Sequence, residues 1–105
     1  MLSTIKKWLG LPTSPPITKA DVEEGTVIDV RSPGEFNGGH LPGSVNIPLD
    51  LLGRSSARIK KMDQPIITCC ASGMRSAAGA KMLRAQGLDA RNGGSWQKVA
   101  RLMDS

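Results

Sequence analysis

Short strands and helices alternate along this chain, and this alternation limits its fold more than any other feature of the sequence. Apolar, β-branched runs typical of buried strands are separated by stretches with helical spacing or helix-capping residues. The expected strands cover residues 26–30, 44–47, 65–69 and 88–91, and the expected helices cover residues 19–24, 33–36, 51–61, 76–86 and 96–103. A helix that connects two parallel strands packs against their sheet, so this order predicts an α/β fold with a largely parallel sheet.

The length and composition fit one domain. A chain of 105 residues is near the usual size of a single domain, with 39% hydrophobic and 22% charged residues. This composition excludes a disordered acidic tail, a collagen-like repeat and a coiled coil. No stretch approaches the roughly 20 apolar residues that a membrane-spanning helix needs. We expect residues 17–105 to form the domain.

Residues 1–16 are expected to form an amphipathic helix followed by a proline-rich linker. Leu2, Ile5, Trp8 and Leu9 have helical spacing. The apolar run is too short and too interrupted for a secretory signal, which favours a cytoplasmic protein. Two interpretations of the helix remain open: it packs on its own domain, or residues 1–11 contact a membrane surface or a partner.

The net charge of +5 is concentrated in the second half of the chain. Residues 54–105 hold ten Lys and Arg against three Asp, which favours binding of small anions or of an acidic partner. Because no aromatic-rich or RNP-like stretch accompanies these charges, we do not expect a nucleic-acid partner.

The only two cysteines, Cys69 and Cys70, are adjacent. In an extended segment their side chains point to opposite faces, so a disulfide between them would be strained. His40 is the only histidine, too few ligands for a zinc site. We therefore expect free thiols, no metal and no cofactor.

Cys70 stands where the third expected strand gives way to a helix, the position at which α/β sheets bind ligands. The small residues Ala71, Ser72 and Gly73 let the backbone N–H groups converge on one point, and the following helix adds the positive end of its dipole. Arg75 adds a permanent positive charge. Each of these features stabilises a thiolate over a thiol, so Cys70 is the candidate nucleophile. We interpret Cys69 as a small buried strand residue.

The chain resembles single-domain rhodanese (thiosulfate sulfurtransferase-like) proteins over roughly residues 17–103. The matching motifs occur in the family's order: Val27–Arg31, Glu35-Phe36, Gly39–Pro48, the loop Cys70–Ser76, Leu83 with Gly87, and Asn92–Trp96. The resemblance implies a three-layer fold with a mainly parallel five-stranded sheet between helices. It also implies that a sulfane sulfur moves from an anionic donor such as thiosulfate to Cys70, and from that persulfide to cyanide, a thiol or a sulfur carrier.

On this resemblance, Cys70 is catalytic and the loop residues bind the donor: Ala71, Ser72, Gly73, Met74 and Arg75. Arg75 is expected to orient the anion. Asp29, Arg31 and Ser76 are expected to support the loop, with Asp29 and Arg31 either orienting its backbone or pairing with Glu35. The Gly-His-Leu-Pro-Gly context of His40 indicates a turn residue.

Two alternatives remain open. One is a phosphatase or arsenate reductase on the same fold, but such enzymes need five residues between the Cys and the Arg, and only four separate Cys70 from Arg75. The other is a non-catalytic rhodanese-like interaction module.

Overall fold

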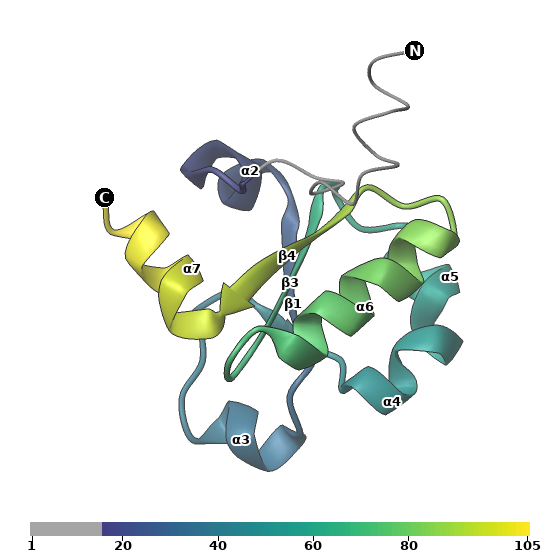
Figure 1. Ribbon diagram of the computed structural model, residues 1–105, viewed down its shortest axis with the longest axis horizontal. Coiled ribbons are helices and arrows are strands. Elements are labelled where there is room, and N and C mark those ends of the chain that lie inside the picture. The colour runs from purple at the N-terminus through teal and green to yellow at the C-terminus, as the bar shows by residue number, and fades with distance from the viewer. Residues whose placement is uncertain (1–15) are drawn as a thin grey trace, which may run out of the picture.

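The computed structural model describes residues 16–105, so the interpretations of residues 1–15 lie outside the described residues. The elements follow in the order α2 (Lys19–Glu24), β1 (Thr26–Asp29), α3 (Pro33–Asn37), β2 (Val45–Asn46), α4 (Leu49–Leu52), the 3-10 turn η1 (Gly53–Ser55), α5 (Ser56–Ile59), β3 (Ile66–Cys70), α6 (Met74–Ala85), β4 (Ala90–Ser95) and α7 (Trp96–Met103) (Figure 1). None of these helices is both long and apolar enough to cross a membrane.

The strands form a parallel sheet in the order β2-β1-β3-β4. The described residues contain four strands, so the five-stranded sheet implied by the resemblance is corrected to four. Pro16 and Ile17 lie near Asn92 and Gly93 of β4 but do not pair with it as a further strand. Pro16 has no N–H to donate to a ladder, and Thr18 already caps α2.

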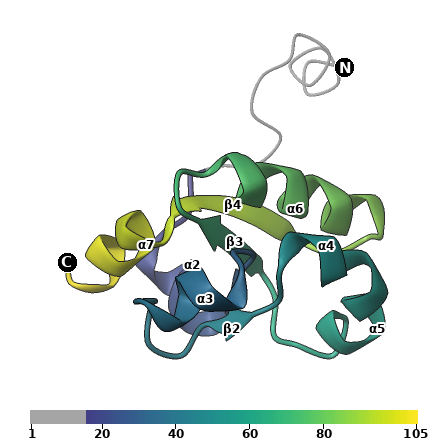
Figure 2. The same ribbon diagram turned by 90° about the horizontal axis from the view of Figure 1, so that it is seen from below.

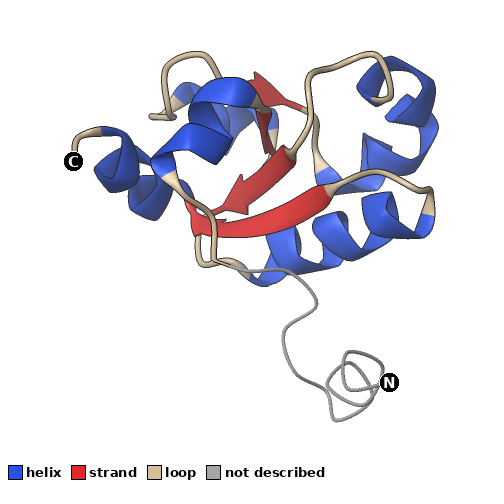
Figure 3. Ribbon diagram, turned by 90° about the horizontal axis from the view of Figure 1, so that it is seen from above, coloured by secondary structure: helices blue, strands red, loops and turns tan. Residues whose placement is uncertain are grey.

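The sheet has helices on both faces, which makes three layers (Figures 2 and 3). On one face, α2 and α7 pack through Val22 and Val99 against Val27 and Ile67. The other face is covered by α4, α5 and α6, whose buried residues are Leu52, Ile59, Ala80 and Leu83. β3 is buried along its whole length, because both of its faces are covered by helices.

Two of the expected helices differ most from the observed ones. The single helix expected over residues 51–61 is divided into α4, η1 and α5. Gly53 and two serines, Ser55 and Ser56, have low helix propensity at this break. The helix expected from Ser76 begins two residues earlier, at Met74, which brings the first turn of α6 close to Cys70.

Candidate active site

The backbone after β3 turns back over the Cys70 side chain. Gly73, the N-cap of α6, has φ +103°, a left-handed conformation that favours glycine. A Cβ at this position would also lie 3.2 Å from the Cα of Gly94, so a side chain there would crowd the β4 backbone. The turn directs the Gly73 N–H at the Cys70 Sγ, with 3.0 Å between nitrogen and sulfur.

Ser76 contributes two further groups to the Cys70 sulfur. Its backbone nitrogen and its Oγ each lie 3.4 Å from the Sγ. Burial of Cys70 raises the pKa of its thiol, but the hydrogen bonds from the Ser76 side chain and from the N–H groups of Ser76, Gly73 and Ser72 outweigh burial, so the pKa lies below its usual value. The loop therefore favours the thiolate form of Cys70.

Cys69 lies in the opposite environment. Its side chain packs among Val22, Val27 and Val99 on the other face of the sheet, which confirms that the two thiols point apart. Burial raises the pKa of the Cys69 thiol to about 12. Cys69 therefore stays protonated, as a small core residue.

Asn92 is a residue of this site that the sequence analysis did not single out as functional. Its Oδ1 accepts hydrogen bonds from the Ser76 hydroxyl (2.7 Å) and the Gly94 N–H (2.9 Å), while its Nδ2 donates to the Gly73 carbonyl (3.1 Å). Asn92 thus connects the middle of the loop, at Gly73, and its last residue, Ser76, to β4. The only signal in the sequence was its place in the Asn92–Trp96 motif.

A β-bulge brings Asn92 to this position. The register between β3 and β4 shifts at Thr68 and Cys69, because Thr68 pairs with Asn92 and Cys69 pairs with Gly94. Gly93 is the extra residue, and a Cβ there would lie 2.7 Å from the Ile67 side chain. The bulge thus requires a glycine directly after Asn92.

Asp29 and Arg31 form a buried ion pair at the carboxyl end of β1. The Arg31 Nη2 lies 2.7 Å from the Asp29 Oδ2, and the Arg31 Nε donates to both carboxylate oxygens. Arg31 also donates to the carbonyls of Glu35 and Gly39 and lies over the Trp96 ring. Arg31 contacts the Glu35 backbone carbonyl and not its carboxylate, so of the two alternatives the ion pair with Glu35 does not form. The pair fixes α3 and the loop after it to the sheet.

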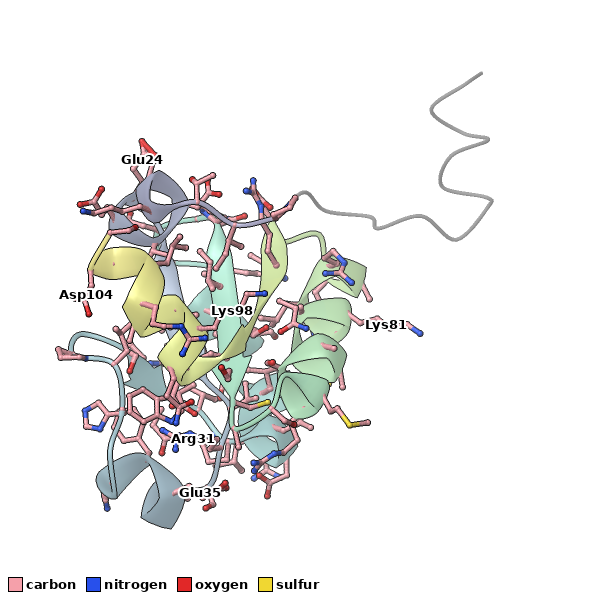
Figure 4. The ribbon with its side chains drawn as sticks, turned by 60° about the vertical axis from the view of Figure 1, so that its left-hand side comes forward. Glu24, Arg31, Glu35, Lys81, Lys98 and Asp104 are labelled. Carbon is pink, nitrogen blue, oxygen red and sulfur yellow. The ribbon has the colours of Figure 1, made fainter. Side chains whose placement is uncertain are left out.

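The Glu35 carboxylate pairs with Arg75 instead. Arg75 Nη1 and Nη2 lie 2.7 and 2.9 Å from the two Glu35 oxygens, and both side chains are about 40% exposed. Figure 4 shows Glu35 on α3, near Arg31. Arg75, expected to orient an anionic donor, thus holds a carboxylate of its own chain.

The remaining predicted residues lie at the surface of the loop or in the turn after α3. Ala71, Ser72 and Met74 are exposed, with Met74 81% accessible, so the loop presents backbone groups to Cys70 and side chains to solvent. His40 stacks on Phe36 and its Nδ1 lies 2.8 Å from the Phe36 carbonyl, as suits a turn residue. Within residues 16–105, no three His, Cys, Asp or Glu side chains form a group able to hold a metal ion.

The site is therefore an anion-binding loop with a cysteine at its centre. The Cys70 thiol is buried at the carboxyl end of a parallel strand, and the N–H groups of Gly73 and Ser76 converge on its sulfur. Residues 14–102 match the family model of the rhodanese-like domain, and the chain belongs to this family.

Individual relatives agree with this assignment. The chain is 39% identical over 69 residues to an uncharacterized protein, YqhL, of Bacillus subtilis, covering 66% of this chain and 54% of that protein. It is 36% identical over 75 residues to the thiosulfate sulfurtransferase GlpE of Pseudoalteromonas translucida, covering 66% of this chain and 65% of that protein. The chain thus spans between about half and two thirds of these relatives.

Solved structures show the same fold. A rhodanese-related protein from Thermoplasma volcanium superposes with a TM-score of 0.68 at 32% identity, covering 84% of this chain and 92% of that one. A human single-domain sulfurtransferase superposes with a TM-score of 0.66 at 21% identity, covering 84% of this chain and 96% of that one. At this identity the likeness shows only that the fold is shared.

Proposed function

We propose that this chain is a sulfurtransferase that carries a sulfane sulfur as a persulfide on Cys70. The observation that carries the proposal is the geometry around the sulfur: the N–H of Gly73 at 3.0 Å and the N–H and hydroxyl of Ser76 at 3.4 Å. These donors lower the pKa of the Cys70 thiol despite its burial, which supplies the thiolate that the reaction needs.

In the first half-reaction the Cys70 thiolate attacks the outer sulfur of the donor. With thiosulfate, a bond forms between the Cys70 Sγ and that sulfur, the donor's S–S bond breaks, and sulfite leaves with the electron pair. In the second half-reaction, cyanide or a thiolate attacks the outer sulfur of the persulfide, and the Cys70 thiolate is restored. This is covalent catalysis, which divides one transfer into two easier steps.

We propose that the backbone of Ala71–Arg75 holds the negative charge that both steps place on sulfur. The amide groups of this turn and the N-terminus of α6 are fixed before the reaction, so they stabilise charge without reorganising. Asn92 supports this arrangement by holding both the Gly73 carbonyl and the Ser76 hydroxyl. Asp29 and Arg31 fix the neighbouring backbone and act only on the scaffold.

The names of the relatives support sulfur transfer as a class. They include a thiosulfate sulfurtransferase, a putative sulfur carrier protein and a tRNA sulfurtransferase. Small sulfur donors and thiol, cyanide or sulfur-carrier acceptors are the partners that we propose. Because free thiols suit a reducing compartment, we also propose that the protein is cytoplasmic.

Intact-mass spectrometry tests the proposal. The protein is incubated with thiosulfate or with an organic persulfide, and we expect it to gain the mass of one sulfur atom and lose it again when cyanide is added. Cys70→Ser should not gain sulfur, whereas Cys69→Ala, the matched control on the adjacent residue, should gain it.

A protein that gains sulfur from neither donor, or a Cys70→Ser variant that still gains it, would contradict the proposal. Hydrolysis of an aryl phosphate without sulfur loading would favour the phosphatase alternative.

A further inference from the structure

The guanidinium at the active-site loop is neutralised by the chain itself. Two N–H groups of Arg75 bind the two oxygens of the Glu35 carboxylate at 2.7 and 2.9 Å. This bidentate contact is the one that an incoming oxyanion would make with an arginine. An anionic donor must therefore displace Glu35 to make this same bidentate contact with Arg75.

Glu35 remains close to Arg75 even if that contact opens. Its Oε1 also accepts hydrogen bonds from the Ser32 N–H and the Ser32 hydroxyl, each at 3.1 Å, in the capping box of α3. Release of Arg75 would thus leave an anchored carboxylate beside the bound anion. The hydrogen bonds from Arg75 and Ser32 hold the pKa of Glu35 at about 2, so this group is charged at neutral pH.

A mainly apolar cavity adjoins Arg75. It has a volume of about 530 Å³, within the range of small-molecule sites. Its lining consists of Val30, Ser32, Pro33, Pro48, Leu49, Asp50, Leu51 and Arg75. The Val30 N–H donates to the Cys69 carbonyl (2.9 Å), and the Leu49 N–H donates to the Val30 carbonyl (3.0 Å), so the cavity wall is built on the end of β3 from which the loop begins.

The charges around the cavity do not favour a dianion. Among the described residues that line it, Arg75 is the only cation and Asp50 is the only carboxylate. The Arg75 guanidinium is already paired with the carboxylate of Glu35. The apolar walls offer an inorganic oxyanion no hydrogen bonds but would bury the hydrocarbon part of an organic molecule.

We propose that the preferred sulfur donor is an organic persulfide, R–S–SH, whose apolar group R lies in this cavity, and that Glu35 selects against inorganic dianions such as thiosulfate. This inference rests on the proposed persulfide chemistry of Cys70 and names its substrate class. Glu35 acts through Arg75 and through its own charge, as a specificity-determining residue.

The transfer balances without an added oxidant or reductant. The Cys70 thiolate attacks the outer sulfur of R–S–SH and forms a new S–S bond. The S–S bond of the donor breaks, and its electron pair leaves on the R–S sulfur, which takes up the proton of the persulfide. The products are R–SH and the Cys70 persulfide anion.

Loading kinetics of the full chain test the inference with two donors, thiosulfate and benzyl hydropersulfide released from a protected precursor. We expect the unmodified protein to load faster from the benzyl donor at equal concentration. Glu35→Gln keeps an oxygen for the Ser32 hydrogen bonds but removes the charge, so kcat/KM for thiosulfate should rise about tenfold, mainly through a lower KM. Loading from the benzyl donor should change by about threefold or less, because this donor carries at most one negative charge, on the persulfide, and its R group is uncharged.

Two further variants separate specificity from general effects. Glu24→Gln makes the same change in net charge at the opposite end of the molecule (Figure 4) and should leave loading from both donors unchanged. Leu51→Ser places a polar group in the cavity at a residue already 38% exposed, so the fold should tolerate it. It should slow loading from the benzyl donor but not from thiosulfate.

The outcomes distinguish this inference from the proposed function. Faster loading from thiosulfate, an unchanged KM for thiosulfate in Glu35→Gln, or an unchanged benzyl-donor rate in Leu51→Ser would overturn the inference while leaving the Cys70 persulfide intact. A failure of Cys70 to load from either donor would overturn the proposed function itself.

Discussion

The hydroxyl of Ser76 lies 2.7 Å from the Oδ1 of Asn92 and 3.4 Å from the Sγ of Cys70, so one proton is available to two acceptors. When Cys70 is a thiol, its S–H can donate to the Ser76 oxygen, and the Ser76 hydroxyl donates to the Asn92 Oδ1. When Cys70 ionises, the Ser76 hydroxyl can rotate and donate its hydrogen bond to the thiolate instead. Asn92 Oδ1 then keeps the hydrogen bond from the Gly94 N–H, so no buried acceptor loses all its donors.

Ser76→Ala should weaken the thiolate of Cys70. The variant keeps the backbone N–H of residue 76 and loses the hydroxyl, so the pKa of Cys70 should rise toward that of a free thiol. Since a hydrogen bond to a charged group contributes roughly 1.5–3 kcal/mol, alkylation of Cys70 at mildly acid pH should slow by about tenfold or more. The measurement is the iodoacetamide reaction rate against pH in a Cys69→Ala background.

Ser55→Ala is the control for that experiment. The Ser55 hydroxyl donates only to the Leu51 carbonyl within the described residues, and it lies outside the loop. Its pH profile should match that of the Cys69→Ala parent. A Ser76→Ala profile identical to the parent would show that the backbone N–H groups alone hold the thiolate.

Asp29→Ala should destabilise the fold strongly. The Asp29 carboxylate is fully buried and the Arg31 side chain is only 6% exposed, so the variant leaves a buried guanidinium without its counter-charge. Removal of one partner from a buried pair costs roughly 3–5 kcal/mol. We expect that loss in the free energy of unfolding in urea. Asp63→Ala, at an exposed carboxylate, should stay within about 0.5 kcal/mol of the unmodified protein, and equal effects of the two changes would contradict a structural role for the pair.

The contribution of Glu35 to stability should depend on acid pH. The hydrogen bonds from Arg75 and Ser32 lower the pKa of Glu35 from 4.5 to about 2. Because the folded pKa lies below the usual value, the stabilisation is fully present above pH 4.5 and is lost as the pH falls through about 2. The difference in Tm between the unmodified protein and Glu35→Gln should therefore be largest above pH 4.5 and should close toward pH 2. In an Arg75→Ala background the same difference should be smaller at every pH, and a difference independent of pH would contradict the assignment.

The layers and the nucleophile could be predicted from the sequence because both depend on local patterns. The apolar runs at residues 26–30 and 65–69 mark central strands, and α2 and α7 have the expected bounds, 19–24 and 96–103. In the structure each of these helices begins after a side-chain N-cap, Thr18 and Ser95. Cys70 was evident from its place between a strand and a run of small residues.

The partners of Arg75 and Asn92 could not be predicted, because they depend on long-range contacts. Glu35 is 40 residues from Arg75 in the sequence, and Asn92 is 16 residues from Ser76. Sequence spacing places Arg75 in the loop but does not show that α3 reaches its side chain. The bulge that turns Asn92 toward the loop is likewise a property of the pairing between β3 and β4, not of β4 alone.

Gly93→Ala should disturb both the fold and the site, since Gly93 is the bulge residue between β3 and β4. A methyl group there would meet the Ile67 Cγ2 at 2.7 Å, the Val99 Cγ2 at 2.9 Å and the Thr68 carbonyl at 3.0 Å, so β4 must move away from β3. Overpacking of this kind costs roughly 1–3 kcal/mol in the free energy of unfolding. The shift would also carry Asn92 away from Ser76, so alkylation of Cys70 should move to higher pH along with the loss of stability.

Gly34→Ala is the matched control for Gly93→Ala, because it adds the same methyl group where nothing lies within 4 Å. Gly34 is inside α3, where alanine is the better helix former, so stability should stay equal or rise by up to about 1 kcal/mol. The pH profile of Cys70 should not change in this variant. If Gly93→Ala were as stable as Gly34→Ala and kept the same alkylation profile, the close approach at the bulge would not be what holds Asn92 at the active-site loop.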